Sequence, residues 1–287
     1  MEVFQLLEHS VPFLLAATGM LGLVVGSFLN VVIYRLPLIM ERTWLRELQE
    51  HRGDDTTADS GETAYNLITP ASSCPQCGHR ITALENIPVI SYLFLRGRCA
   101  GCGVRIPLRY PVVETVTAVL SIIVALRFGF SVQTLAALAF TWALVPLFMI
   151  DFDHQLLPDS ITLPLLWGGL LLSLPGVFTD STSSIIGAAA GYMSLWSIYH
   201  AFRLLTGKEG MGYGDFKLLG AIGAWVGWQG LPVVVLFSSL VGAIIGIGLT
   251  LLRGRDHTQP MPFGPFLAAA GWLTLLWGGD IIAFYLH

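Results

Sequence analysis

Charged residues are scarce in this chain. Asp, Glu, Lys and Arg make up only 12% of its 287 residues, whereas 54% are hydrophobic. A soluble domain usually carries about 25% charged residues, and the deficit here is concentrated in long segments that contain no charge. Such segments are typical of transmembrane helices. The composition therefore excludes an ordinary soluble globular protein.

Several other signals are missing. The first ten residues contain no Lys or Arg. Because a secretory signal begins with a positively charged region, we do not expect one there. The chain has neither the His-Glu-x-x-His of zinc proteases nor the Gly-x-Ser-x-Gly of serine hydrolases. Its basic residues avoid aromatic clusters, so we expect no nucleic-acid partner.

Apolar segments recur along the whole chain, and they predict an all-α polytopic membrane protein with about eight transmembrane helices. Two of the segments, the second and the sixth, are shorter than the roughly 20 residues that a bilayer core requires. Glycine pairs four residues apart, beginning at Gly22, Gly187 and Gly242, predict close packing between helices. The segments cover residues 11–34, 112–126, 132–150, 161–177, 185–205, 216–226, 231–252 and 262–286.

Basic residues indicate how the chain is oriented. The sequence has fifteen Lys and Arg residues, and all except Arg127 fall in residues 35–111 or in later turns on the same side of the membrane. Because positive loops stay in the cytoplasm, we expect both termini outside and residues 35–111 inside. The turns that hold Asp151 and Asp215 are then cytoplasmic as well.

The long polar loop suggests three parts to the chain. We predict a first transmembrane helix at 1–34, a cytoplasmic four-cysteine domain at 35–111 and a membrane-embedded domain at 112–287. Within the loop, residues 41–62 are acidic. There we expect a short surface helix around 44–48, followed by a flexible stretch.

All four cysteines lie in the loop as two Cys-x-x-Cys pairs. Cys74 and Cys77 form the first pair, Cys99 and Cys102 the second, and 21 residues separate them. Four thiolates suit tetrahedral zinc, and a site with four protein ligands is structural because it leaves no position open. A disulfide framework is the alternative, but a cytoplasmic loop is reducing. His79 lies nearby and could replace a ligand, although a solvated loop histidine is the simpler interpretation.

Two aspartates stand at the ends of apolar segments. Asp151 directly follows residues 132–150, and Asp215 follows three alternating glycines at 210, 212 and 214. Ionisable groups in such places are functional hypotheses by default. A helix N-cap is the alternative for Asp215, and it is the interpretation that we favour for Asp159. We expect Asp153 to be interfacial and solvated.

Paired carboxylates can hydrolyse a peptide bond without a metal or a serine. Two that share one site hold a single proton between them. The ionised member activates a water, while the protonated member polarises the scissile carbonyl and later protonates the leaving amine. Since Asp151 and Asp215 are expected on the same side of the membrane, the sequence predicts an aspartyl peptidase site formed by this pair.

These motifs together resemble a known family. The segment Gly-Met-Gly-Tyr-Gly-Asp215 is similar to the Gly-x-Gly-Asp signature of membrane-embedded aspartyl proteases, and Ile-Asp151-Phe-Asp-His-Gln-Leu-Leu-Pro-Asp resembles the first-aspartate motif of type IV prepilin peptidases. The resemblance covers nearly the whole chain, except for a variable acidic insert at about 41–69. Further matching segments are Gly26-Ser-Phe-Leu-Asn30, the two cysteine pairs, Glu85-Asn86-Ile-Pro, Arg96-Gly97-Arg98-Cys99 and Pro262-Phe-Gly-Pro265-Phe.

The resemblance implies a bifunctional enzyme of the bacterial inner membrane. Members of the family remove the short basic leader from prepilins and pseudopilins at the cytoplasmic face, so the substrates of this chain would belong to type IV pili, type II secretion, or both. Those with the four-cysteine loop also methylate the new N-terminal residue, usually phenylalanine, with S-adenosylmethionine. By this resemblance Asp151 and Asp215 are the catalytic residues. Weak candidates for the methyl-donor site are Glu85, Asn86, Arg96 and Gly97, and scaffolding around the metal is an equal alternative for them.

Two other functions compete with the enzyme. A transporter would place acids near the bilayer midplane and often contains internal repeats, and no repeated half is visible. A membrane-anchored zinc module could act as an assembly scaffold, with the aspartates only capping helices. The oligomeric state does not follow from the sequence.

Overall fold

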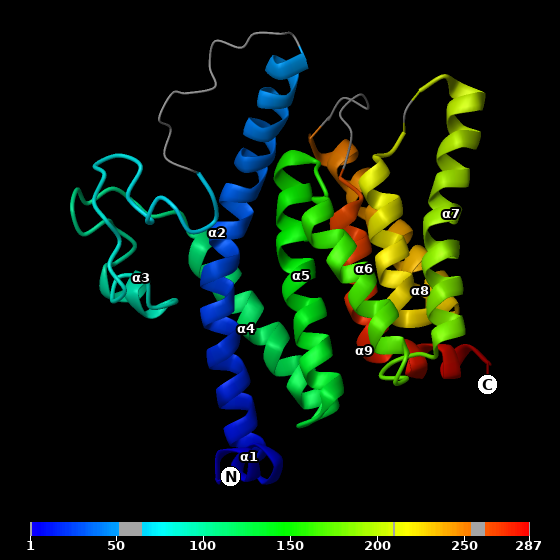
Figure 1. The fold of residues 1–287 in the computed structure, drawn as a ribbon, viewed down its shortest axis with the longest axis horizontal. Coiled ribbons are helices and arrows are strands. Elements are labelled where there is room, and N and C mark those ends of the chain that lie inside the picture. The colour runs from blue at the N-terminus through cyan, green and yellow to red at the C-terminus, as the bar shows by residue number, and fades with distance from the viewer. Residues whose placement is uncertain (1, 52–64, 209, 254–261, 287) are drawn as a thin grey trace. The chain divides into compact units, whose positions relative to one another are not determined.

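A computed structural model describes residues 2–51, 65–208, 210–253 and 262–286. The described residues form helices joined by turns, and two isolated bridges in the cysteine loop are their only β pairing. The all-α class expected from the apolar segments is therefore confirmed (Figure 1). The helices are α1 (Glu2–His9), α2 (Val11–His51), α3 (Ile90–Phe94), α4 (Arg109–Phe128), α5 (Val132–His154), α6 (Asp159–Ser173), α7 (Ser181–Thr206), α8 (Tyr213–Arg253) and α9 (Gly264–Leu286).

The chain divides into two compact units, residues 1–126 and 127–287. This boundary lies one helix later than the one expected from polarity, because α4 packs tightly on α2. A Cβ at Gly22 would lie 2.7 Å from the Cα of Ala118, and a Cβ at Gly26 would lie 2.8 Å from the Cα of Glu114. Only glycine allows the two backbones this close, which confirms the helix packing predicted for this glycine pair.

The first unit contains α1 to α4 and the cysteine loop. Its helix α2 continues unbroken from the apolar segment to His51, through Pro37. The helix expected around residues 44–48 is therefore the end of α2 and not a separate element. Arg35 of α2 fastens the start of the loop, since its guanidinium donates to the carbonyls of Asn66 and Pro70 at 3.1 and 2.7 Å. The flexible stretch predicted after this helix falls largely on residues 52–64, outside the described residues.

The second unit contains α5 to α9. Helices α7 and α8 pack closely through glycines: a Cβ at Gly187 would lie 2.3 Å from the carbonyl oxygen of Gly223, and one at Gly191 would lie 2.6 Å from that of Leu219. Gly242 of α8 faces the ring of Phe266 in α9. These contacts confirm that the glycines of α7 and α8 serve helix packing.

Within the described part of the chain, five helices are long and apolar enough to cross a bilayer: α2, α4, α5, α8 and α9. The predicted count of about eight spans is not confirmed. Helix α4, expected to be short, has 20 residues because it begins before and ends after the apolar segment. Helix α6 has only 15 residues. Helix α8 counts once, although its backbone breaks at Gly227, where φ is 73°. That break lies between the sixth and seventh predicted segments.

Candidate active site and metal centre

Asp151 and Asp215 come together in the second unit. Asp151 lies in the last turn of α5, and Asp215 in the first turn of α8, so both occupy the end of the unit where α9 also begins (Figure 1). Both residues are buried, with 5% and 7% of their surface exposed. The two carboxyl groups are close enough to interact electrostatically. The structure therefore brings together the pair that the sequence singled out.

The two carboxyl groups have different surroundings. The N–H of Gly264, the first residue of α9, donates to Asp151 Oδ2 at 2.9 Å. Asp215 Oδ1, in contrast, is buried and has no hydrogen-bond partner among the described residues. A buried polar atom without a partner is costly, and such an atom is therefore available to a water or a substrate. Asp215 is the third residue of α8 and not its N-cap, so the capping alternative is wrong for it.

Glycines around the pair provide space, not unusual backbone angles. A Cβ at Gly264 would lie 2.6 Å from Asp151 Oδ2, and one at Gly214 would lie 2.8 Å from the Cβ of Leu157. Gly212 and Gly214 have no left-handed φ. These two glycines are therefore not required by a left-handed backbone. Gly214 is needed because the turn after α5 passes directly against the start of α8.

Asp159 does not cap α6. The N-cap is Pro158, which has no side chain able to hydrogen-bond, and Asp159 begins the helix. Its carboxylate instead accepts from Lys217 Nζ of α8 at 2.7 and 2.8 Å. The capping interpretation is thus wrong, because a cation on the neighbouring helix holds this carboxylate. Asp153 is exposed, as expected for an interfacial residue.

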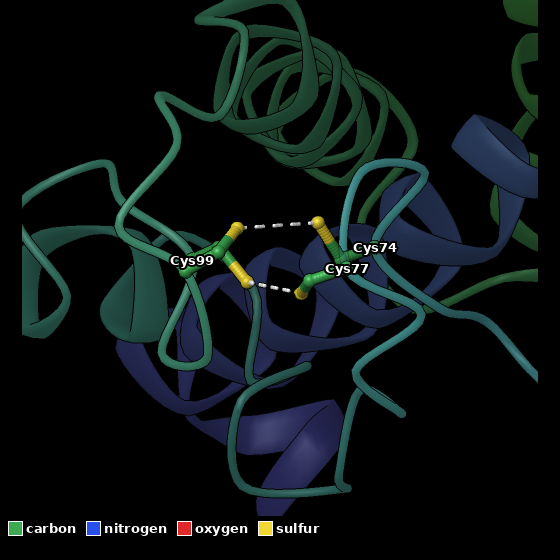
Figure 2. A group of neighbouring side chains, drawn as sticks. Cys74, Cys77 and Cys99 are labelled. Atoms are coloured by element: carbon green, nitrogen blue, oxygen red, sulfur yellow. Dashed lines mark hydrogen bonds between the residues drawn. The ribbon is translucent and has the colours of Figure 1, made fainter.

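The four cysteines form one cluster in the first unit. Their sulfurs all lie within 4.8 Å of one another, and all four thiols are free of disulfides. Cys74 and Cys102 are 3.9 Å apart at their sulfurs, as are Cys77 and Cys99. Figure 2 shows the thiols of the first pair facing those of the second. Four sulfurs bound to zinc at about 2.3 Å would lie about 3.8 Å apart, so the cluster fits such an ion.

Each cysteine pair lies in the same kind of turn. Gly78 and Gly103, which follow the pairs, have left-handed φ values of 70° and 72°. Their N–H groups donate to the carbonyls of Cys74 and Cys99, both at 2.9 Å. The turns direct other backbone amides at the sulfurs. Donation from Cys77 and Gln76 N–H lowers the pKa of Cys74 to about 7. The pKa of Cys99 is likewise lowered by the N–H groups of Cys102 and Gly101. These amides therefore favour the thiolate form, which a metal requires, at the first cysteine of each pair.

His79 lies beside the cluster but is not part of it. Its Nε2 lies 3.1 Å from Glu85 Oε1. Glu85 also accepts from the Thr82 N–H at 2.8 Å, and this bond, followed by that to His79, lowers its pKa. Among the described residues, the group of side chains that could bind a metal ion here consists of the four cysteine sulfurs alone. His79 and Glu85 therefore brace the first cysteine turn from outside.

The weak candidates for a methyl-donor site separate into two pairs. Glu85 and Asn86 line a cavity of the first unit, whereas Arg96 and Gly97 do not. Arg96 and Gly97 form a turn with left-handed φ values of 52° and 67°. A Cβ at Gly97 would lie 2.7 Å from the hydroxyl of Tyr92. Gly97 is thus required by the turn that leads into the second cysteine pair.

Two notable residues were missed by the sequence analysis. Gly264 belongs to the Pro262–Phe266 motif, but nothing in the sequence relates it to Asp151, 113 positions earlier. Glu114 is an acidic residue inside the apolar helix α4, and only 8% of its surface is exposed. An ionisable residue inside a transmembrane segment is itself a signal of function, so Glu114 could have been found by the rule that was applied to the aspartates.

Comparisons with known proteins agree with this division of the chain. A family model described as the bacterial peptidase A24 N-terminal domain matches residues 20–128, and one described as the type IV leader peptidase family matches residues 138–247. No solved structure gives a significant match.

Curated relatives match over nearly the full length. The chain is 57% identical over 282 residues to a protein of Aeromonas hydrophila, covering 98% of this chain and 97% of the relative. It is 56% identical to a protein of Aeromonas salmonicida over 98% of this chain and 97% of the relative. A Pseudomonas aeruginosa protein is 52% identical over 98% of this chain and 96% of the relative. All three are named prepilin leader peptidase/N-methyltransferase.

Proposed function

Since this chain belongs to the prepilin leader peptidase/N-methyltransferase family, we propose that it removes the leader of prepilins and pseudopilins with Asp151 and Asp215 and then methylates the new N-terminus. The observation that carries the peptidase assignment is the pair of buried, interacting carboxyl groups at one end of the second unit. The scaffold and transporter alternatives lose support, because they leave this pairing and the names of the relatives unexplained.

The two aspartates have distinct roles in the proposed cleavage. In this proposal the two carboxyl groups share one proton, because two carboxyl groups in one site cannot both ionise readily. The Gly264 N–H stabilises negative charge on Asp151, so Asp151 is the base that activates water. Asp215, with Oδ1 unpartnered, carries the proton toward the scissile carbonyl. As the intermediate collapses, that proton passes to the leaving amine.

The metal centre is proposed to be structural zinc. The sulfur distances and free thiols fit zinc, and four thiolates leave no position for substrate. The ion would hold the two cysteine turns together, and these turns carry several of the residues that line the cavity of the first unit. Cleavage in the second unit then needs no metal.

Methylation is the second proposed reaction. When bound, S-adenosylmethionine would supply the methyl group: the amine lone pair attacks the methyl carbon, the carbon–sulfur bonding electrons leave on sulfur as S-adenosylhomocysteine departs, and a proton passes from the nitrogen to solvent. The protein's task is mainly to align the amine behind that bond. We place this reaction in the first unit, since Asp151 and Asp215 have no part in it.

The site is proposed to face the cytoplasm of the inner membrane. Several helices able to span a bilayer make this a multi-pass membrane protein. The basic residues support the orientation, because all but Arg127 gather on one side with both cysteine pairs and both aspartates. Basic prepilin leaders present their cleavage sites on that same side.

Gly264→Ala is expected to slow leader cleavage about 100-fold, because a displacement near 1 Å at a catalytic group has that order of effect. The added Cβ would lie 2.6 Å from Asp151 Oδ2, so the carboxylate must move. The control is Gly279→Ala in the same helix, where a Cβ meets nothing within 4 Å. The measurement is the rate at which purified enzyme shortens prepilin, followed by mass. Equal cleavage rates in both variants would show that Asp151 does not occupy its proposed position in the active site.

Cleavage and methylation are expected to be separable. Asp215→Asn protein should methylate a synthetic peptide that already begins with the mature phenylalanine, yet leave full-length prepilin uncut. Gly97→Ala should do the reverse, because its Cβ collides with Tyr92 in the first unit. The assay is transfer of labelled methyl from S-adenosylmethionine. If wild-type enzyme cuts prepilin but never methylates the product at saturating donor, the methyltransferase assignment is wrong.

A further inference from the structure

The first unit contains a cavity of about 590 Å³. Its walls come from α2, from both cysteine turns and from the start of α4, and its lining includes Cys74 and Cys99. Sites for small molecules and cofactors usually measure about 300–1,000 Å³ and combine apolar walls with a few placed polar groups. Val31, Ile106 and Tyr110 provide apolar and aromatic wall, while Glu114 and Asn86 provide polar groups.

A buried carboxylate lies in the wall of this cavity. Glu114 belongs to α4 and is 8% exposed. It accepts the Val89 N–H at 2.7 Å and a hydrogen bond from the Ser27 side chain. Among the described residues it forms no ion pair with Lys, Arg or His. Two neutral donors only partly compensate a charge held in apolar surroundings, so the cavity wall favours a positively charged ligand.

The basic side chains of the cavity do not neutralise Glu114. Arg35 donates to backbone carbonyls of the loop, and Arg105 is exposed. The other lining acid, Glu85, is already held by His79 and Thr82. Glu114 is consequently the carboxylate whose negative charge remains without a positive partner in the cavity.

The same carboxylate holds a strained backbone. Val89, whose N–H it accepts, has a φ of 60°. A left-handed conformation is a true outlier for a β-branched residue, and such strain persists at functional sites where the surroundings enforce it. Val89 precedes α3, and Ser91, Tyr92 and Leu95 from α3 and its end line the cavity. Glu114 thus holds the backbone that leads into the cavity wall and also places a negative charge in that wall.

We infer that this cavity binds S-adenosylmethionine and that the carboxylate of Glu114 faces its positively charged sulfonium. The inference rests on the methyltransferase part of the proposed function and assigns it a place. The flat adenosyl group suits the apolar and aromatic wall. The sulfonium supplies the positively charged partner that the Glu114 carboxylate lacks. Loss of that charge after transfer weakens the contact and helps the product, S-adenosylhomocysteine, to leave.

The test compares a charged with a neutral ligand. Equilibrium binding of S-adenosylmethionine and S-adenosylhomocysteine is measured on the full-length, zinc-loaded protein. Glu114→Gln keeps the size of the side chain and an acceptor for Val89. It should weaken S-adenosylmethionine binding about tenfold, because only that ligand carries a charge to attract. Binding of S-adenosylhomocysteine should change less than about twofold, since its thioether is neutral.

Two further variants serve as controls. Glu47→Gln makes the same charge change at an exposed position of α2 outside the cavity, and both ligands should bind to it as they bind to the wild type. Val31→Phe fills the cavity from α2, and both ligands should bind at least about tenfold more weakly, because the added ring occupies their space. Unchanged prepilin cleavage and zinc content show that each variant is folded.

Each outcome decides a different point. If Val31→Phe and Glu114→Gln bind both ligands as the wild type does, the cavity assignment is overturned. If Glu114→Gln weakens both ligands equally, Glu114 does not face the sulfonium. If the wild type binds neither ligand and never methylates cleaved prepilin, the methyltransferase part of the proposed function fails instead.

Discussion

Asp151→Asn and Asp215→Asn are each expected to abolish leader cleavage. An amide can neither activate water as a carboxylate does nor deliver the shared proton. A positioned acid or base contributes about 10²–10⁴-fold to a rate, and the two aspartates act as a unit, so each change should remove nearly all activity. Asparagine keeps the shape of the side chain, and the protein should remain folded and inserted. The measurement is the rate of prepilin shortening, followed by mass.

Asp153→Asn and Asp159→Asn are the matched controls, because they make the same change nearby. Asp153 is exposed, and Asp159 pairs with Lys217 at side chains that are 52% and 36% exposed. An exposed ion pair contributes about 0–1 kcal/mol to stability, so cleavage should stay near the wild-type rate. An Asp151→Asn or Asp215→Asn enzyme with near-normal turnover would show that its missing carboxylate has no catalytic role.

Replacing any one cysteine by serine is expected to release the metal. The wild type should contain about one equivalent of zinc, because its four sulfurs are arranged for one ion. A structural zinc contributes about 10–16 kcal/mol in small peptides, and the cysteine loop has little core of its own. Cys102→Ser should therefore lower zinc below about half an equivalent and reduce methyl transfer. Metal analysis and the methyl-transfer assay measure the two effects.

His79→Gln is the control for the cysteine variants. His79 lies beside the cluster, but its ring nitrogen bonds to Glu85 and the candidate metal ligands are the four cysteine sulfurs, so zinc should remain bound in this variant. A chelator applied briefly should leave cleavage intact, since the aspartates need no metal. Immediate loss of cleavage, restored by zinc, would contradict the proposed mechanism. Wild-type protein with fully reactive thiols and little zinc would contradict the closed metal site.

The candidate site was predictable where local chemistry identifies a residue. Two Cys-x-x-Cys pairs specify four sulfurs for one ion, and an aspartate directly after an apolar segment is conspicuous. The sequence could not show that Gly264 donates to Asp151, because that contact depends on how α9 packs. Nor could it show that Lys217 holds Asp159, since an acid before a helical segment looks like a cap until its neighbour in space is known.

The fold was predictable in class but not in its helix ends. Apolar length located the long apolar helices of the described residues but divided α8 into two segments, because burial in lipid demands unbroken hydrophobic surface. Composition did not reveal that α2 continues to His51, since a polar helical extension looks like any surface segment. It also could not reveal the pairing of α2 with α4, because Gly22 and Gly26 carry no mark of which helix they approach.

Short helices beside the aspartate pair have a consequence for the surrounding lipid. Helix α6 has 15 residues, or about 22 Å at 1.5 Å per residue. The part of α8 before the break at Gly227 is about 21 Å long by the same measure. The hydrocarbon core is about 30 Å thick, so neither helix matches it. Lys217 and Asp159 tie the two helices together, and thinning of the bilayer is one way in which lipid accommodates such short helices. Thinning at this place would bring headgroups and water toward the carboxyl groups, and with them the water that hydrolysis consumes.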